Sequence, residues 1–242
     1  MSRRDELAAN LAALRERIAA ACAAADRDVG EITVIAVTKT FPASDIRLLA
    51  GLGVTEIGEN RDQEAAPKAA ECADLDLTWH FVGQLQTRRC RSVSRYASVI
   101  HSVDRERLVS VLGIQARRAG RELTCLVQVS LDGPAGRGGQ DGPAGPGGRG
   151  GIAPDQAPGL AGQIAAEHGL RLGGVMAVAP LGVPARHALP VLAAVSRDVR
   201  SAHPGATMIS AGMSGDLEDA IECGATHLRI GTALLGARTF VR

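Results

Sequence analysis

The stretch Ile32-Thr-Val-Ile-Ala-Val-Thr-Lys-Thr40 decides the class of fold. It is apolar, rich in β-branched residues and too short for a typical helix, so it predicts a β-strand. Its hydrophobicity is nearly continuous rather than alternating, which is typical of a strand buried on both faces in a parallel sheet. Pro42 follows closely and cannot donate to a sheet ladder, so the strand should end near Lys39.

Lys39 is the first candidate functional residue, because α/β proteins place their chemistry at the carboxyl ends of parallel strands. A partly desolvated lysine has a lowered pKa and can attack a carbonyl group to form a Schiff base. The alternative is a lysine that leaves the strand and extends its ammonium group into solvent.

Strand and helix patterns alternate along the rest of the chain. Further strands are expected at residues 54–58, 77–82, 98–103, 123–129, 170–178, 207–210 and 227–230. Helices are expected at residues 44–50, 62–72, 88–96, 104–119, 154–168 and 185–202, with another ending at 223. Eight strands without a change of composition between the halves favour a closed (β/α)8 TIM barrel over an open sheet. The prediction is an α/β protein with one domain spanning 1–242.

Several local features refine this prediction. Leu7, Leu11, Leu14 and Ile18 form one stripe of an extra N-terminal helix over residues 3–25, which could cover the bottom of the barrel. Ser44 and Asp45 are expected to cap the helix at 44–50, and Pro67 to interrupt the helix at 62–72. Gly173 and Gly174 should allow close backbone approach within a strand.

The pattern breaks at residues 132–151, which are almost entirely glycine, proline, alanine and arginine. The segment Asp132-Gly-Pro-Ala-Gly-Arg-Gly-Gly139 recurs nine residues later as Asp141-Gly-Pro-Ala-Gly-Pro-Gly-Gly148. It lacks the ending of a phosphate-binding P-loop and the triplet period of collagen. We therefore expect a flexible loop inserted after the fifth strand and dispensable for folding.

Composition excludes several classes of function. The net charge is +1, and no basic cluster is interleaved with aromatic residues, so a nucleic-acid partner is not expected. The N-terminus predicts an amphipathic helix rather than a signal peptide or a membrane span. The five cysteines and the histidines show no metal-ligand spacing, and the cysteines are interpreted as buried side chains in a reducing cytoplasm.

In a barrel the loops after all eight strands share one rim, so Lys39, Asn60, Ser210 and Thr232 should be neighbours. Ser210-Ala-Gly-Met-Ser214 and Gly231-Thr232 offer backbone amides and hydroxyl groups to a phosphate. A phosphorylated aldehyde that condenses with a lysine is pyridoxal 5'-phosphate (PLP), and Arg229 could be the partner of its ring nitrogen.

These residues belong to segments that resemble one family. The segments are Ala36-Val-Thr-Lys-Thr40, Gly58-Glu-Asn60, Trp79-His-Phe-Val-Gly83 with Leu85-Gln86, Gly174-Val-Met-Ala177, Gly212-Met-Ser214, and Arg229-Ile-Gly-Thr232 with Gly236-Ala-Arg238. They span nearly the whole chain in order. In them the chain resembles the pyridoxal-phosphate homeostasis (PLP-binding) proteins, single-domain relatives of the alanine racemase barrel.

The resemblance implies a role for each matched residue. Lys39 would be the lysine that holds PLP as a Schiff base, and Arg229 would lie at the pyridine nitrogen. The remaining cofactor-binding positions are Asn60 and His80 near the ring, and Ser210, Met213, Ser214, Gly231 and Thr232 around the phosphate. Family members usually carry a lysine after Leu-Gln, where this chain has Arg88 and Arg89. They also carry a Lys-x-Gly segment that aligns with Arg149-Gly-Gly151.

The predicted function is intracellular PLP homeostasis by a monomer: buffering the cofactor or delivering it to PLP-dependent apo-enzymes. One alternative is a PLP-dependent amino-acid racemase or related enzyme. Another is a barrel that binds a different phosphorylated metabolite without covalent chemistry. Racemisation needs a base on each face of the substrate. Lys39 could serve one face, but the single tyrosine, Tyr96, is expected near the opposite rim, although His80 could be an unrecognised second base.

Overall fold

A computed structural model describes residues 1–132 and 150–237 of the chain. In these ranges eight strands pair in parallel and in sequence order, and the last pairs with the first, so the sheet closes into a barrel. The strands are β1 (Thr33–Val37), β2 (Glu56–Glu59), β3 (Thr78–Phe81), β4 (Val99–Val103), β5 (Leu123–Gln128), β6 (Leu170–Met176), β7 (Met208–Ser210) and β8 (His227–Ile230). The predicted TIM barrel is confirmed.

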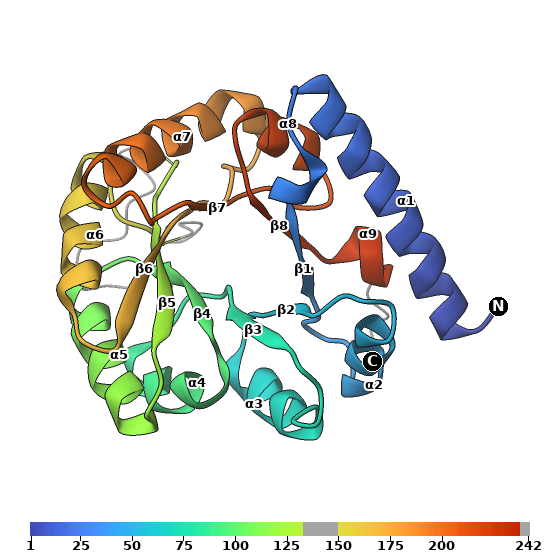
Figure 1. Ribbon diagram of the computed structural model, residues 1–242, viewed down its shortest axis with the longest axis horizontal. Helices are drawn as coiled ribbons and strands as arrows, with labels where there is room; N and C mark the ends of the chain where they lie inside the picture. The colour runs from blue at the N-terminus through green and yellow to red at the C-terminus, as the bar shows by residue number, and fades with distance from the viewer. Residues whose placement is uncertain (133–149, 238–242) are drawn as a thin grey trace.

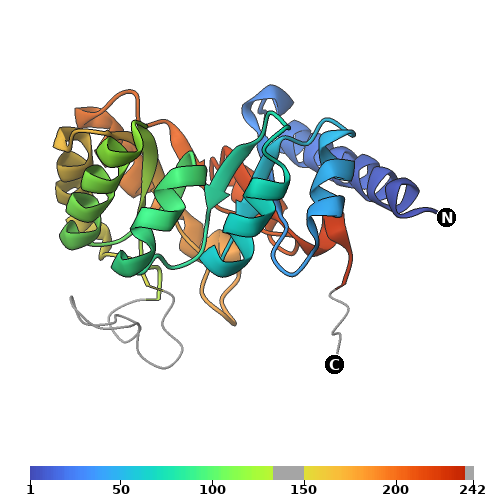
Figure 2. The same cartoon turned by 90° about the horizontal axis from the view of Figure 1, so that it is seen from below.

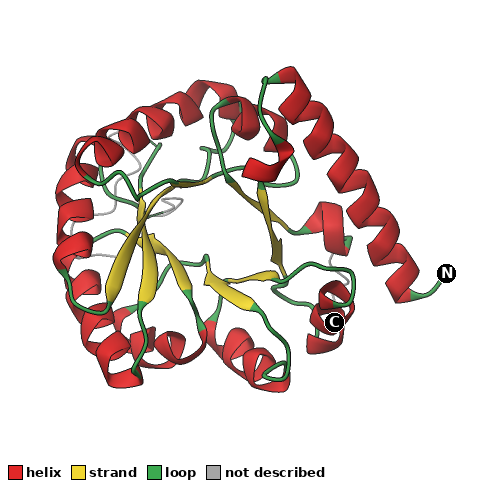
Figure 3. Ribbon diagram, viewed as in Figure 1, coloured by secondary structure: helices red, strands yellow, loops and turns green. Residues whose placement is uncertain are grey.

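Helices surround this inner ring of strands, as Figures 1 and 3 show. They are α1 (Arg3–Ala24), α2 (Ala43–Ala50), α3 (Asp62–Glu71), α4 (Cys90–Tyr96), α5 (Glu106–Ala119), α6 (Ala157–Ala166), α7 (Ala185–Ala202), α8 (Leu217–Glu222) and α9 (Thr232–Leu235). Short 3₁₀ turns lie at Val29–Glu31, Thr87–Arg89 and Pro154–Gln156. The four-residue helix α9 was not predicted, because its signal is shorter than any periodic pattern can reveal.

Two hydrophobic clusters fill the part of the molecule that the structure describes. The larger lies between the strands and the helices and includes Cys125 and Val127 of β5. The smaller lies inside the barrel and joins Val99, Leu126 and Met176, with Val178 and Met208 packed against it. Successive residues of β5 therefore point alternately to the helices and to the interior, although the whole strand is buried. This alternation decides which side chains can reach the barrel interior.

Close backbone approach between β6 and β7 requires glycine, as predicted. Gly174 has a φ of +148°, and a Cβ atom there would lie 2.0 Å from the carbonyl oxygen of Met208. Gly173 faces Thr124, whose methyl carbon would lie 2.5 Å from an added Cβ atom. Gly174 thus lets β6 lie close to the backbone of β7, and Gly173 leaves room for side chains of β5.

The N-terminal helix does not cover the bottom of the barrel. It packs along the outside against α8, α9 and α2, and Figures 1 and 2 place it at one side of the ring. Its buried stripe is the one predicted from the sequence: Leu7, Leu11, Leu14, Ile18 and Cys22. The expectation was wrong because the stripe finds its apolar partners on the outer helix layer.

Two local predictions also failed. Helix α2 begins at Ala43, and Asp45 is not its cap, because its carboxylate accepts hydrogen bonds from Arg3 of α1, at 2.7 Å from Nη2. Helix α3 runs through Pro67 without interruption. Proline removes one helical N–H and strains the turn before it, but the packing of buried Ala65 and Ala69 on either side outweighs that cost.

Residues 133–149, which include nearly all of the duplicated segment, lie outside the described residues, so the flexibility and dispensability of the loop at 132–151 stay predictions. Its flanks lie side by side: Val129 and Ile152 form a parallel bridge, and the N–H of Ile152 donates to the Gln128 carbonyl at 2.8 Å. All five thiols are free, and Cys223 is only partly buried, contrary to expectation. Within the described ranges, no helix combines the length and apolar character that a membrane crossing needs.

Candidate functional site

A pocket of about 310 Å³ opens at the carboxyl ends of the strands, and we name it the rim pocket. It is lined by Val37, Lys39, Phe41, Asn60, Val82, Val178, Met213, Ser214, Gly215, Arg229, Gly231 and Thr232. The volume falls at the lower end of the range for small-molecule sites. Seven of the nine predicted site residues therefore line one pocket, although they are spread over most of the sequence.

The strand end that carries Lys39 is fixed by a buried ionic cluster. The hydroxyl of Thr38 donates to Glu59 Oε1 at 2.7 Å, and Lys68 Nζ donates to the same oxygen at 2.7 Å. Lys68 also donates to the Thr38 carbonyl at 2.9 Å. Burial raises the pKa of Glu59, and its bonds to Lys68 and Thr38 act in the opposite direction. The cluster ties β1 to β2 and α3 directly behind Lys39.

The turn after Lys39 is held in an unusual conformation. Thr40 has a φ of +71°, which is rare for a β-branched residue and costs free energy. Its N–H donates to Glu64 Oε2 at 3.1 Å, and the N–H of Phe41 donates to the Thr38 carbonyl at 3.0 Å. Contacts from α3 thus hold the strained turn, and with it the backbone on which Lys39 stands.

Lys68, the only other lysine in the chain, is placed differently. Its side chain is 11% exposed and its ammonium group is engaged by Glu59 and Thr38. Lys39 is half-buried and lines the rim pocket. Of the two ε-amino groups, that of Lys39 is the one in position to meet a molecule in the pocket.

Arg229 brings a buried positive charge to the wall of the pocket. The residue is 5% exposed, and its guanidinium donates to Ser210 Oγ at 2.6 Å and to the Ala177 carbonyl at 2.8 Å. Burial lowers its pKa to about 10, against the smaller opposing effect of Asp216, so the group stays charged at neutral pH. Both acceptors are neutral, which leaves the charge available to a hydrogen-bond acceptor in the pocket.

Two tight turns beside Arg229 supply further lining residues of the pocket. Ser214 Oγ accepts a hydrogen bond from the N–H of Ala233 at 3.1 Å and so joins the turn before α8 to the start of α9. Gly212, with a φ of +87°, brings its carbonyl to the N–H of Arg229 at 2.9 Å. The N–H of Thr232, at the first position of α9, has no partner within the helix. Hydroxyl and amide groups of this kind suit a phosphate.

Asn60 supplies an observation that bears directly on a ligand. Its Oδ1 atom is buried and has no hydrogen-bond partner among the described residues, and the residue itself lines the rim pocket. A buried amide oxygen without a partner costs free energy. A polar ligand group in the pocket would satisfy it. Together with the amine of Lys39 and the buried cation of Arg229, the residues present fit a phosphorylated aldehyde with a ring nitrogen.

Two predicted residues do not line the pocket. Ser210 is fully buried behind Arg229, and its Oγ also contacts Nδ1 of His101 at 2.9 Å. His80 is 2% exposed and lies deeper in the barrel, between Glu56 and His101. Both expectations placed a polar strand residue at the rim. The side chains of Ser210 and His80 instead point into the barrel interior and form hydrogen bonds with other protein groups.

Sequence reasoning missed the supporting residues Glu59, Lys68 and His101. Lys68 lies nine residues after Glu59, on the helix that follows the strand, and only the barrel geometry brings the two together. His101 has the signal that could have revealed it, a polar residue at an inward position of a buried strand. No group of three or more His, Cys, Asp or Glu in the described ranges is arranged to hold a metal ion.

Tyr96 takes no part in the pocket. Its ring packs edge-on against Trp79, with centroids 6.2 Å apart, in the layer between β3 and α4. Burial, followed by the charges of Asp62 and Glu59, raises the pKa of its phenol. A larger groove of about 850 Å³ lies on the outer surface along α7 and the end of α8, and none of the predicted site residues lines it.

Comparison with known proteins gives consistent matches over nearly the whole chain. A model of the alanine racemase N-terminal domain matches residues 4–239. The chain is 40% identical over 252 residues to the pyridoxal phosphate homeostasis protein of Mycobacterium tuberculosis, covering 98% of this chain and 94% of that protein. It is 33% identical over 242 residues to the protein of the same name from Escherichia coli, covering 98% of each.

A solved structure shows the same architecture. PipY of Synechococcus elongatus, in a structure with PLP bound, superposes with a TM-score of 0.79 at 31% sequence identity. The match covers 95% of this chain and 100% of PipY.

Proposed function

The chain belongs to the alanine racemase N-terminal domain family, and we propose that it binds PLP through a Schiff base on Lys39 and acts in PLP homeostasis. The observation that carries the proposal is the convergence of Lys39 and the buried Arg229 on one pocket of about 310 Å³. The homeostasis role is supported by the names of its relatives, and the cofactor by the PLP-bound structure of PipY.

Each wall of the rim pocket would hold one part of the cofactor. Lys39 would meet the aldehyde, Arg229 would donate to the pyridine nitrogen, and Ser214, Gly231 and Thr232 would hold the phosphate. Asn60 would meet a polar group of the ring, and Met213, at the pocket edge, would cover one side. When bound, PLP supplies an aldehyde that condenses with amines and a ring that withdraws electrons.

The residues that line the pocket favour a carrier over a racemase. A racemase needs a proton donor or acceptor on each face of the substrate α-carbon. Among the described lining residues Lys39 is the only ordinary acid–base group, since Arg229 stays protonated and the lining includes no His, Tyr, Cys, Asp or Glu. His80, which could have been a second base, lies behind the pocket.

Binding is tested by titrating the purified protein with PLP and following the visible absorption that a lysine-bound cofactor gives. We expect a yellow complex in the wild type and none with Lys39→Ala, whereas Lys68→Arg, which keeps the charge beside Glu59, should still turn yellow. Pyridoxal without the phosphate should bind more weakly. Noncovalent binding of equal strength in the Lys39→Ala variant would favour the alternative of a barrel without covalent chemistry.

The carrier role is tested by mixing the loaded protein with a PLP-dependent apo-enzyme and a scavenger that captures free cofactor. We expect the enzyme to be activated faster than free PLP allows in the presence of the scavenger. Exchange of α-protons of amino acids in heavy water tests the racemase alternative. Turnover near the enzyme median of about 10 s⁻¹ would contradict the carrier role.

The setting of this function stays a prediction. The five free thiols support a reducing compartment such as the cytoplasm. The proposal includes PLP-dependent apo-enzymes as partners and a monomeric state, and size-exclusion chromatography with light scattering measures the latter.

A further inference from the structure

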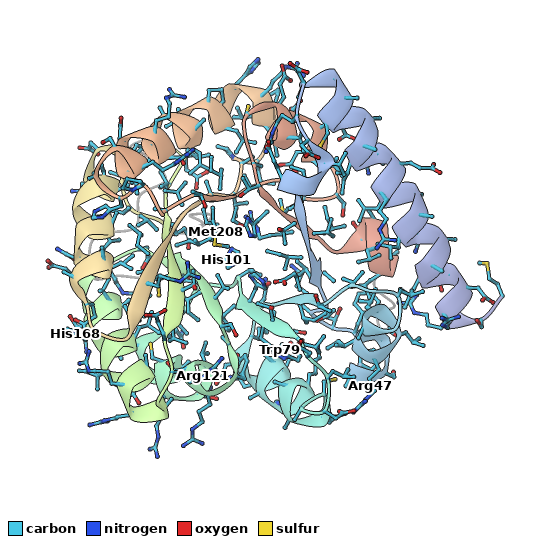
Figure 4. All side chains as sticks on the ribbon, in the orientation of Figure 1. Arg47, Trp79, His101, Arg121, His168 and Met208 are labelled. Atoms are coloured by element: carbon cyan, nitrogen blue, oxygen red, sulfur yellow. The ribbon has the colours of Figure 1, made fainter. Side chains whose placement is uncertain are left out.

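A line of polar side chains crosses the interior of the barrel, from the rim pocket to the other end. Arg229 donates to Ser210 Oγ at 2.6 Å, and Ser210 Oγ lies 2.9 Å from Nδ1 of His101. Nε2 of His101 lies 2.8 Å from Nδ1 of His80, and Nε2 of His80 lies 2.5 Å from Glu56 Oε2. Figure 4 shows His101 inside the ring of strands.

The chemistry of the two ends gives this line a direction. A guanidinium can only donate hydrogen bonds, and an ionised carboxylate can only accept them. Burial opposes ionisation of Glu56, but its hydrogen bond with His80 brings its pKa below the ordinary value. The Ser210 hydroxyl must therefore donate to Nδ1 of His101. His101 then donates from Nε2–H to Nδ1 of His80, and His80 donates from Nε2–H to the Glu56 carboxylate. In this arrangement every group in the line has a partner.

We propose that Ser210, His101 and His80 are positioning residues that hold Arg229 toward the rim pocket and connect its orientation to the protonation of His80 at the far side of the barrel. This inference rests on the proposed function, because the ligand that it affects is PLP. It assigns a role to His80 and Ser210, two residues that do not line the pocket.

Protonation of His80 reverses the direction of the hydrogen bonds between His80, His101 and Ser210. A doubly protonated His80 must donate from Nδ1 to His101. Burial, with the charges of His80, Arg229 and His227 acting in the same direction, lowers the pKa of His101 well below its ordinary value. His101 therefore stays neutral and now donates from Nδ1 to Ser210. Ser210 then receives two donors, and its own hydroxyl hydrogen has no partner among the described residues. The hydrogen bond from Arg229 to Ser210 should then hold the guanidinium less firmly, and the ligand should bind more weakly.

The charged groups around His80 come from several strands. Glu56 of β2, 28% exposed at its side chain, connects the line to solvent at the amino-terminal end of the barrel. His227 of β8 lies nearby but bonds to Thr226, at 2.8 Å from Oγ1, and stands outside the line. Burial, then the charge of His80, lowers the pKa of His227 to about 4, against the effect of Glu56. Facing groups on the other elements are His101 on β4 and Arg229 on β8.

The test compares PLP affinity at pH 8 and pH 5.5 in three proteins. Glutamine at position 80 can accept from His101 and donate to Glu56, but it cannot take up a proton. We expect His80→Gln to bind PLP within about twofold of wild type at pH 8. Between pH 8 and pH 5.5 the variant should lose about tenfold less affinity for PLP than wild type, because it avoids the cost of leaving the buried Ser210 hydroxyl without a partner. The matched control His227→Gln should keep the wild-type profile. Identical pH profiles for His80→Gln and wild type would overturn the proposal.

Two further measurements separate this inference from the proposed function. Ser210→Ala removes the acceptor of Arg229 and should weaken PLP binding about tenfold at both pH values. Nitrogen NMR of the cofactor-free protein at pH 8 should show His101 with its proton on Nε2, and a proton on Nδ1 would overturn the proposed direction. If no variant binds PLP, the proposed function fails, and the NMR result still decides whether the line exists.

Discussion

At the scale of single residues, the buried guanidinium of Arg229 forms hydrogen bonds with neutral protein groups. Arg229 is oriented by a hydroxyl and a carbonyl rather than by a carboxylate, so its charge is not cancelled within hydrogen-bond distance. A guanidinium with this pKa does not give up its proton near neutrality. The residue is therefore suited to holding a ring nitrogen as an acceptor, and poorly suited to making the ring a strong electron sink.

Replacement of Ser214 tests the phosphate side of the pocket. Ser214→Ala removes one hydroxyl and the acceptor of the Ala233 N–H. One hydrogen bond to a charged group contributes about 1–3 kcal/mol, so PLP affinity should fall about tenfold without being abolished. Fluorescence titration measures the loss. If the same substitution changed pyridoxal binding equally, Ser214 would not be a phosphate ligand.

The ionic cluster behind Lys39 predicts a pH-dependent loss of stability. Lys68→Met leaves Glu59 buried without its partner, which should cost about 3 kcal/mol near neutral pH. The pKa of Glu59 is already raised and would rise further. A raised pKa favours the fold only while the carboxyl is protonated, so the loss should be larger at pH 8 than at pH 5.

Urea unfolding at the two pH values measures this effect. The double variant Lys68→Met/Glu59→Gln should recover a large part of the stability at pH 8, because the uncompensated charge is gone. An equal loss at both pH values would show that Glu59 is not the cause.

At the scale of elements, α1 braces the two turns that are proposed to hold the phosphate. Arg17 donates to the Ser214 carbonyl at 3.2 Å, Asn10 to that of Leu234 at 3.0 Å, and Arg3 to that of Leu235 at 2.9 Å. The helix thus contacts both turns from outside, without lining the pocket. Besides adding its apolar stripe to the main hydrophobic cluster, α1 thus holds these turns in place.

This brace predicts an effect at a distance. Arg17→Ala should weaken PLP binding about threefold, because it removes one hydrogen bond that orders the turn containing Ser214. Arg15 lies on the same helix, is exposed and has no described partner, so Arg15→Ala is the matched control and should leave affinity unchanged. Equal effects of the two substitutions would assign the change to net charge instead.

The contact between β6 and β7 predicts opposite effects for two glycine substitutions. Gly174→Ala forces a Cβ atom against the Met208 carbonyl at a positive φ, and should cost more than about 3 kcal/mol or prevent folding. Gly162 lies inside α6 with no atom within 4 Å of the added Cβ. Gly162→Ala should stabilise by about 0.5–1 kcal/mol. Thermal unfolding compares them, and tolerance of Gly174→Ala would contradict the close approach.

At the scale of the whole molecule, periodicity was enough to predict the barrel but not everything inside it. The strand around Ile35 could be predicted because the apolar run is short and rich in β-branched residues, which favours a strand over a helix. The strand ends then place Lys39 and Arg229 at one rim, whatever their separation in sequence. The depth of a polar side chain was not predictable, because His80 and Ser210 point inward on strands that are buried on both faces.

The same limit applies to contacts between elements. Lys68 and Glu59 pair across a helix and a strand, and Asp45 pairs with Arg3 rather than capping its own helix. Such pairs depend on the packing of the helix layer, which no local pattern encodes. Pro67 shows the reverse case, a strong local signal that tertiary packing overrides.

Trapping of the cofactor on the protein tests the central claim most directly. The purified chain is incubated with PLP, reduced with borohydride, digested and analysed by mass spectrometry. Only Lys39, Lys68 and the N-terminal amine can react, so the readout is unusually simple. We expect one reduced phosphopyridoxyl group per chain, on the peptide that contains Lys39, and none in Lys39→Ala. A label on Lys68 or the N-terminus alone, or an unmodified chain, would contradict the assignment of Lys39.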